Sequence, residues 1–223
     1  MKRVLINLLV GASFMMLSTS VSAQENELIP ENTISVSGGY GILPELSPWG
    51  NGYRSESKGG FSGSLQYARL YKSGQKLGVG FGLVYSIHKE SADYFVKEGG
   101  FSVKDRPALN YIAPMLVVRR VENEHWMYGM NIGIGYLNYY NKGKKEGLKS
   151  VITGNSIGMN VDLTGEYRFN KHWGIGADVS FNGGYIKKLH DKTGDVKETV
   201  KLNKDNRINA FRIDFLLGIR YHF

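Results

Sequence analysis

The chain lacks cysteine altogether and has only 5 prolines among its 223 residues. The missing cysteine excludes disulfide frameworks, thiolate zinc sites and cysteine catalysis. Few prolines beside 29 glycines favour many β-strands over a collagen-like chain or a linker. A charged fraction of 22% and a mean hydropathy of −0.27 exclude a bundle of membrane helices, while 14 Tyr and 10 Phe are too many aromatics for a disordered chain. The length indicates one domain, or at most two small ones.

The first 23 residues have the pattern of a cleaved signal peptide. Two basic residues precede an apolar run at positions 4–17, and Val21 and Ala23 stand at the −3 and −1 positions of a signal-peptidase site. Gln24 is therefore the expected mature N-terminus. The apolar run would form a helix of about 21 Å, too short to cross a hydrocarbon core of about 30 Å. No cysteine follows it, so a lipoprotein anchor is also excluded.

Apolar residues alternate with small or polar residues through most of the remaining chain, as in strands that have one apolar face. The strand around Pro114 alternates poorly, so its facing stays open. The eight strands that the pattern predicts are residues 34–42, 60–71, 77–88, 108–121, 126–136, 157–169, 173–185 and 211–223.

The connections between these strands alternate in length. The long ones are residues 43–58, 89–106, 141–150 and 188–206, and the short ones are 72–76, 122–125 and 170–172. Short turns at one end, long loops at the other and an even number of strands are typical of outer-membrane barrels. We therefore expect an all-β fold, an eight-stranded antiparallel transmembrane β-barrel with short periplasmic turns and long extracellular loops, over residues 33–223. Residues 24–32 would form a short periplasmic segment.

The side chains opposite the apolar face are small, polar or charged, which favours lipid outside the barrel over the alternative of a soluble, lipocalin-like barrel. Aromatic residues gather near the strand ends and predict two belts. The belt beside the short turns would hold Tyr71, Trp126, Tyr128, Tyr167, Phe169, Trp173, Tyr221 and Phe223. The belt beside the long loops would hold Tyr40, Phe61, Tyr85, Tyr111, Tyr136, Tyr185 and Phe211.

The last strand ends in Phe223, preceded at alternate positions by Tyr221, Ile219 and Leu217. With this ending, the chain resembles the small eight-stranded outer-membrane proteins of the OmpA/OmpX type over nearly all of its mature length. The resemblance implies that these four residues form the signal that the barrel-assembly machinery reads. It also implies an outer-membrane location in a Gram-negative envelope, and members of the family serve as structural, adhesive, lipid-binding and occasionally enzymatic proteins.

Charged residues fall on the inward face of the predicted barrel. They are Asp162, Glu166, Arg168, Asp178, Arg212, Asp214 and Arg220, with Arg120 added if the fourth strand faces that way. If Phe169 faces Trp173 across a short turn, Asp162 lies opposite Ser180, and Glu166 lies opposite Gly176. Unpaired charges in a narrow lumen are costly, so we expect a salt-bridged network that plugs the lumen. A proton or ion path, or a carboxylate pair for acid–base chemistry, is the alternative.

Catalytic and cofactor signals are weak. Ser86 and His88 share one face of a strand near the outer rim, but barrel-type lipid A deacylases carry His before Ser, and that order is absent here. No His, Asp or Glu cluster has metal-ligand spacing, and the glycine-rich runs have strand period rather than that of a phosphate loop. We expect no catalytic residue, no metal and no cofactor.

The third long loop is basic, with Lys142, Lys144, Lys145 and Lys149 against Glu146 alone. Its glycines predict a mobile segment whose charges either stay solvated or meet lipid and sugar phosphates of the outer leaflet. Expected partners are therefore outer-membrane lipid and lipopolysaccharide, the assembly machinery, and a host or surface ligand at the long loops, with no nucleic acid.

The leading function that these patterns predict is a non-enzymatic structural or surface-interaction role, which covers adhesion, lipopolysaccharide binding and stabilisation of the envelope. A narrow porin-like channel for small solutes is the first alternative. A lipid-modifying hydrolase at the rim is the second.

Overall fold

The computed structural model describes the chain except for residues 1–28, 44–58, 97–100, 146–147, 195 and 204–206. The expected signal peptide and its cleavage site between Ala23 and Gln24 lie outside the described residues. Eight of the strands form a closed antiparallel ring in the order β1, β2, β3, β5, β6, β7, β8 and β12, and β12 pairs with β1 to complete it. The prediction of an eight-stranded antiparallel barrel is confirmed.

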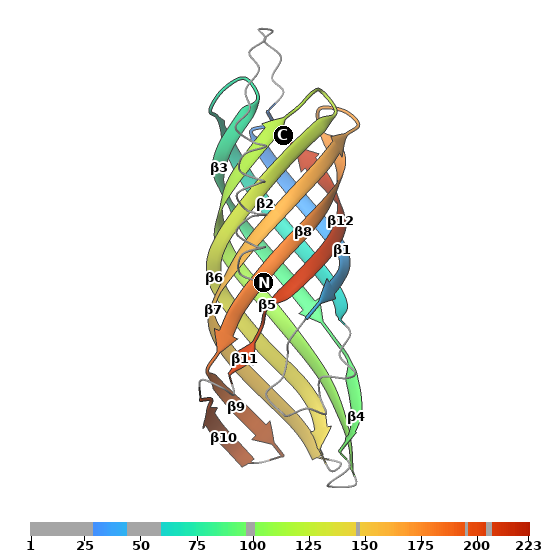
Figure 1. Cartoon of the computed structure of the whole chain (residues 1–223), viewed down its shortest axis with the longest axis vertical. Helices are drawn as coiled ribbons and strands as arrows, with labels where there is room; N and C mark the ends of the chain where they lie inside the picture. The colour runs from blue at the N-terminus through green and yellow to red at the C-terminus, as the bar shows by residue number, and fades with distance from the viewer. Residues whose placement is uncertain (1–28, 44–58, 97–100, 146–147, 195, 204–206) are drawn as a thin grey trace, which may run out of the picture.

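The ring strands have the following bounds: β1 Asn32–Ile42, β2 Gly60–Lys72, β3 Leu77–Lys89, β5 Phe101–Val121, β6 Trp126–Lys145, β7 Leu148–Arg168, β8 Trp173–Ile186 and β12 Arg212–His222. The short turns at 73–76, 122–125 and 169–172 lie at the same end as Phe223, which we name the turn end (Figure 1). The register of the hairpin between β7 and β8 is as predicted, because Asp162 pairs with Ser180 and Glu166 pairs with Gly176.

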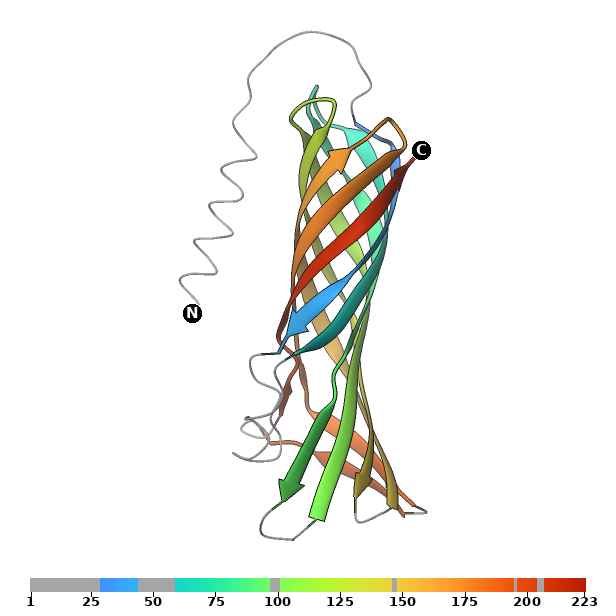
Figure 2. The same cartoon turned by 90° about the vertical axis from the view of Figure 1, so that its right-hand side faces the viewer.

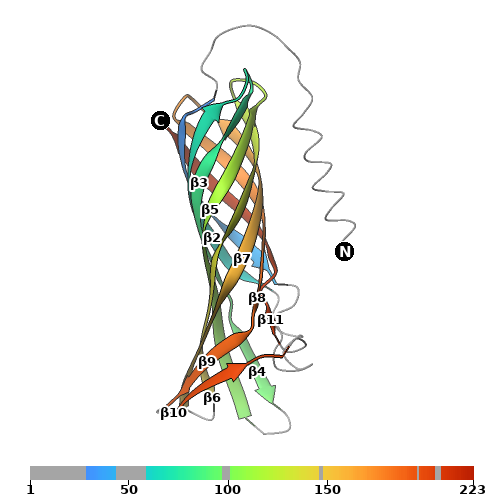
Figure 3. The ribbon, with the colours of Figure 1, turned by 90° about the vertical axis from the view of Figure 1, so that its left-hand side faces the viewer.

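Four further strands lie outside the ring among the described residues, and all but the last of them fall in segments that the sequence predicts as loops. They are β4 Ala92–Val96, β9 Lys188–Thr193, β10 Val196–Lys201 and β11 Ile208–Asn209. β4 pairs with β5, β9 pairs with β7, and β10 pairs with β9. With the long outer parts of β5, β6 and β7, the strands β4, β9 and β10 form a curved sheet, which we name the extension, beyond the rim opposite the turn end (Figures 2 and 3). The short strand β11 pairs with β8. The loop prediction is wrong here, since much of these segments continues the barrel sheet.

The outer surface of the ring is apolar, with exposed apolar side chains on each of its strands. Ile134, Ile157 and Leu217 are each about two-thirds exposed or more, and the neighbouring outward positions are equally apolar. Water would make such a continuous surface unstable, whereas hydrocarbon suits it. Within the described residues, no helix is long and apolar enough to span a membrane.

The structure settles the facing of the strand around Pro114. Odd-numbered residues of β5 point into the lumen, while Pro114 points outward at a position where pairing with β6 is interrupted. The inward arginine is therefore Arg119, which is 7% exposed, and not Arg120. Tyr111 is 1% exposed in the lumen, so its assignment to the outer aromatic belt is wrong.

β5 hides its strand pattern because it is apolar on both faces. Its inward side chains include Leu109, Met115 and Val117, and its outward ones include Ile112 and Leu116. Period-two alternation marks a strand only when its two faces meet different surroundings.

Candidate functional site: the lumen

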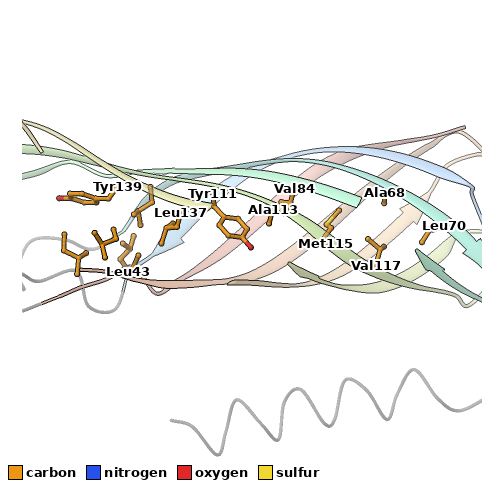
Figure 4. Packing of buried hydrophobic residues seen from close by; sticks show 14 of the residues in the cluster. Leu43, Ala68, Leu70, Val84, Tyr111, Ala113, Met115, Val117, Leu137 and Tyr139 are labelled. Atoms are coloured by element: carbon orange, nitrogen blue, oxygen red, sulfur yellow. The ribbon is translucent and has the colours of Figure 1, made fainter. Parts of the chain in front are cut away.

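The lumen has two unlike walls. One wall is apolar and runs along most of the barrel, with side chains from β2, β3, β5 and β6 (Figure 4). Its members include Leu70, Val84, Leu109, Tyr111, Ala113, Met115, Val117, Met127 and Leu137. The other wall is polar, formed mainly by β1, β7, β8 and β12, and it carries the predicted network residues.

Asp214 organises the polar wall near the extension. It accepts hydrogen bonds from Arg212 Nε at 2.8 Å, from Ser62 Oγ at 2.7 Å and from Asn182 Nδ2 at 3.0 Å. Arg212 is completely buried, and its Nη2 reaches the hydroxyl of Ser86 on β3 at 2.7 Å. A side chain from β12 thus bonds to β3, which lies three strands away around the ring.

Asp162 occupies the middle of the lumen with neutral donors around it. Ser180 Oγ donates to it at 2.6 Å, Asn160 Nδ2 at 2.7 Å and Gln66 Nε2 at 3.0 Å. A buried carboxylate held by several hydrogen bonds is stabilised without a direct cation. Asn160 also donates to Asn182, which joins this group to the Asp214 group.

A second group of ion pairs lies toward the turn end. Arg220 binds Asp178 at 2.5 Å and lies 3.6 Å from Glu166. Glu166 also pairs with His222. Because a carboxylate only accepts, His222 Nε2 donates to it, and His222 Nδ1 lies 2.9 Å from the Thr33 hydroxyl oxygen. The network thus crosses the junction between β12 and β1.

Inward glycines leave the volume that these long side chains occupy. A Cβ added at Gly176 would lie 1.5 Å from Arg220 Nη1, and one at Gly174 would lie 2.4 Å from Glu166 Oε1. The same holds at Gly129, where a Cβ would lie 2.5 Å from Arg119. These glycines of β6 and β8 therefore make room for charged side chains in the lumen.

The structure places all seven predicted network residues in the lumen, each 5% exposed or less. Arg168 differs from the others, because its Nη2 donates to the Asn123 carbonyl oxygen at 3.2 Å in a turn. Sequence reasoning missed Arg119, which donates to Asn131 Oδ1 at 2.6 Å, and it missed His222. The facing of β5 hid the first, and proximity to the chain end hid the second.

The arrangement of Ser62, His88 and Asp214 does not activate a nucleophile. The Ser62 hydroxyl donates its one hydrogen bond to Asp214. His88 Nδ1, which lies 2.7 Å from Ser62 Oγ, must therefore donate to that oxygen and cannot accept its proton. Ser62 and His88 are each 1% exposed. Ser86, the serine that the sequence pairs with His88, instead accepts from Arg212. Among the described residues, no group of three or more potential ligands could hold a metal ion.

Two turns share a sequence pattern, Asn-x-His-Trp, that sequence reasoning also missed. Asn170 Oδ1 accepts from the backbone N–H groups of His172 and Trp173, and His172 Nδ1 lies 3.0 Å from the His222 carbonyl oxygen. The turn that begins at Asn123 repeats these contacts, with Arg168 in place of His222. Each turn fastens its own hairpin to the end of the neighbouring strand.

The basic segment 142–149 is placed differently from its prediction. Lys142, Lys144 and Lys145 belong to β6 and Lys149 belongs to β7, with Lys144 paired to Lys149. These four lysines therefore lie on paired strands and not in an irregular loop, because the hairpin ladder continues through them.

No family model matches the chain, and no curated protein sequence matches it. Solved structures do. The chain is similar to a major outer membrane protein from Thermus thermophilus, with a TM-score of 0.58 and 12% identity over 86% of this chain and 99% of that one. Neisserial surface protein A is similar with a TM-score of 0.53 and 14% identity over 86% of this chain and 97% of that one. The outer membrane protease OmpT from Escherichia coli is similar with a TM-score of 0.51 and 11% identity over 92% of this chain and all of that one.

The fold is that of outer-membrane β-barrels. With identities this low, the likenesses establish the fold alone. The protease activity named for OmpT stays with that protein.

Proposed function

We propose that this chain is an exported, integral outer-membrane protein without enzymatic activity, whose closed barrel anchors an extracellular sheet for contacts at the cell surface. In this proposal the signal peptide at residues 1–23 is removed, the turn end with both mature termini faces the periplasm, and the extension faces outward. The apolar outer surface and the likeness to outer-membrane barrels support it.

The observation that carries the closed lumen is the burial of long charged side chains across it. Arg212, Asp162 and Glu166 are each 2% exposed or less, although they lie inside a ring open at both ends. Eight strands leave an interior that side chains can just fill. The lumen network Asp162, Glu166, Arg168, Asp178, Arg212, Asp214 and Arg220 would therefore act as a plug that fixes the fold.

Two features support the proposed non-enzymatic role, namely the direction of the hydrogen bonds at Ser62 and the burial of His88. A rim hydrolase needs a serine that lipid can reach and a base that accepts its proton. The extension instead supplies a broad, exposed sheet, which suits binding. The last strand, with Leu217, Ile219, Tyr221 and Phe223, would serve the assembly machinery.

Conductance of the refolded protein in planar bilayers tests this proposal. We expect no steady ohmic current, either from the parent or from Glu166→Ala. The variant should instead unfold more easily, by about 1–3 kcal/mol, because removal of Glu166 takes away the acceptor of His222 Nε2 in a buried site, while Arg220 keeps its pair with Asp178. A current that grows with inserted copies of the parent would favour the porin-like alternative and overturn the plug.

A further inference from the structure

A row of basic side chains crosses the outer face of the extension. Backbone pairing sets Arg106 opposite Lys142, Lys142 opposite Val151, Val151 opposite Lys192, and Lys192 opposite Lys197. All four basic residues are exposed. We name Arg106, Lys142, Lys192 and Lys197 the basic row; they come from β5, β6, β9 and β10, and so from three separate predicted loops.

The basic row lies on the same face as the apolar outer surface of the barrel. Side chains alternate along a strand, so Lys142 shares its face with Tyr136, which is 49% exposed. Tyr136 pairs with Ile112 and Ile157, both outward and exposed. Tyr140 shares this face, and Lys142 Nζ lies 5.4 Å from the centroid of its ring, so the basic row begins directly beyond the outward aromatic side chains of β6.

The row is unfavourable for the sheet by itself. Arg106 faces Lys142 and Lys192 faces Lys197 at directly opposed positions, where like charges destabilise a strand pair. The acidic neighbours Asp191 and Glu198 pair with each other on the other face of the same two strands. Charge of one sign is thus gathered on the face that turns toward the surrounding leaflet.

We propose that the basic row binds the phosphate groups of a phosphorylated glycolipid of the outer leaflet. This inference rests on the proposed outer-membrane location. The row continues the lipid-facing surface just beyond the aromatic level, where phosphorylated headgroups lie, and each cation near an anionic surface adds attraction that fades within a Debye length of about 8 Å. A soluble polyanion could reach both faces of the extension equally. The basic row lies only on the face that continues the lipid-facing surface, which favours a lipid.

Retention of lipid A by the detergent-refolded full chain tests the proposal. The probe is bisphosphorylated lipid A, and the lipid retained per barrel after size-exclusion chromatography is counted by mass spectrometry at about 50 and about 500 mM salt. We compare the parent with the triple variant Lys142→Gln, Lys192→Gln, Lys197→Gln. At low salt the triple variant should retain about tenfold less lipid A, and at high salt the difference should shrink.

A matched control removes the same charge elsewhere. Lys72, Lys76 and Lys171 lie in or beside the short turns at the opposite end, and their joint change to Gln should leave retention at the parent level. Heat-dependent gel mobility confirms that each variant is folded. Lipid A without its phosphates should not be retained by the parent.

Three outcomes would overturn the proposal. The first is equal retention of bisphosphorylated lipid A by the parent and the triple variant. The second is loss of heparin binding in the triple variant with lipid A retention unchanged, which assigns the row to a soluble polyanion. The third is displacement of lipid A by inorganic phosphate at the same phosphate concentration, which assigns it to free phosphate. Conductance tests the closed lumen separately, so a conducting barrel that retains lipid A through the row leaves this inference intact.

Discussion

At the scale of single residues, glycines in the lumen leave the space that long charged side chains occupy. Gly174 and Gly176 on β8 stand where any side chain would meet Glu166 or Arg220. The pairing register brings them there, since Glu166 pairs with Gly176 and Arg220 pairs with Gly174. A buried ion pair tolerates little displacement, because its desolvation is offset only at good geometry.

Gly176→Ala should therefore destabilise the barrel. Its methyl group would overlap Arg220 Nη1 and displace the guanidinium from Asp178 and Glu166, at a cost of about 1–3 kcal/mol. Unfolding in urea from lipid vesicles measures the change.

Gly165→Ala on β7 is the matched control, since a Cβ there would lie 3.8 Å from the Tyr128 ring, in ordinary contact. If both variants unfold at the same urea concentration as the parent, the packing argument for Gly176 is wrong.

At the scale of elements, β12 closes the ring and carries the chain end. Both backbone groups of Phe223 bond to Asn32 at 3.0 Å, and its ring stacks on Tyr221 with centroids 5.8 Å apart. Tyr221 in turn contacts Trp173 on β8. The last residue thus belongs to the turn-end aromatic belt and to the junction of the first and last strands.

Deletion of Phe223 should block assembly. The chain would lose two closing hydrogen bonds, one belt aromatic and the terminal ring that the assembly machinery is expected to read. We expect accumulation in the periplasm or degradation, measured by cell fractionation.

Phe223→Tyr keeps the ring and the backbone bonds, so it should reach the outer membrane at the parent level. Normal outer-membrane levels of a chain that ends at His222 would contradict the expectation.

The elements also show how far the sequence alone predicts this molecule. Ring strands such as β3 and β8 are predictable because lipid lies on one side and a polar lumen on the other. The extension is not, because both faces of Lys142–Lys145 lie beyond the apolar band and carry no apolar alternation. The network residues of β7, β8 and β12 follow from period two, whereas Arg119 required the facing of β5. The repeated Asn-x-His-Trp pattern was a usable signal for the two turns.

At the scale of the whole molecule, closure of the ring leaves the membrane-spanning part without an edge strand. β12 pairs with β1 over ten positions, from Ile42 with Ile213 to Thr33 with His222. Exposed edges are where strands separate or pair with other chains, so a closed ring resists both.

The folded protein should therefore resist detergent and change its gel mobility on boiling. The unboiled sample is expected to keep β-type circular dichroism and to migrate apart from the boiled one. A chain truncated before β12 cannot close and should show one mobility under both conditions. A single mobility for the full chain, together with helical circular dichroism, would refute the closed barrel.

The two walls of the lumen differ in when they can form as well as in polarity. The apolar wall comes mainly from β2, β3, β5 and β6, which are successive strands of the ring, so most of its contacts join strands that are close in the sequence. The polar wall depends on Ser37 with Asp178, 141 residues apart, and on Ser62 with Asp214, 152 residues apart. For such distant pairs, the entropy lost on loop closure opposes pairing before any contact is gained. We therefore expect the contacts of the apolar wall to form early in folding, and the charged network to form only after the last strand has paired.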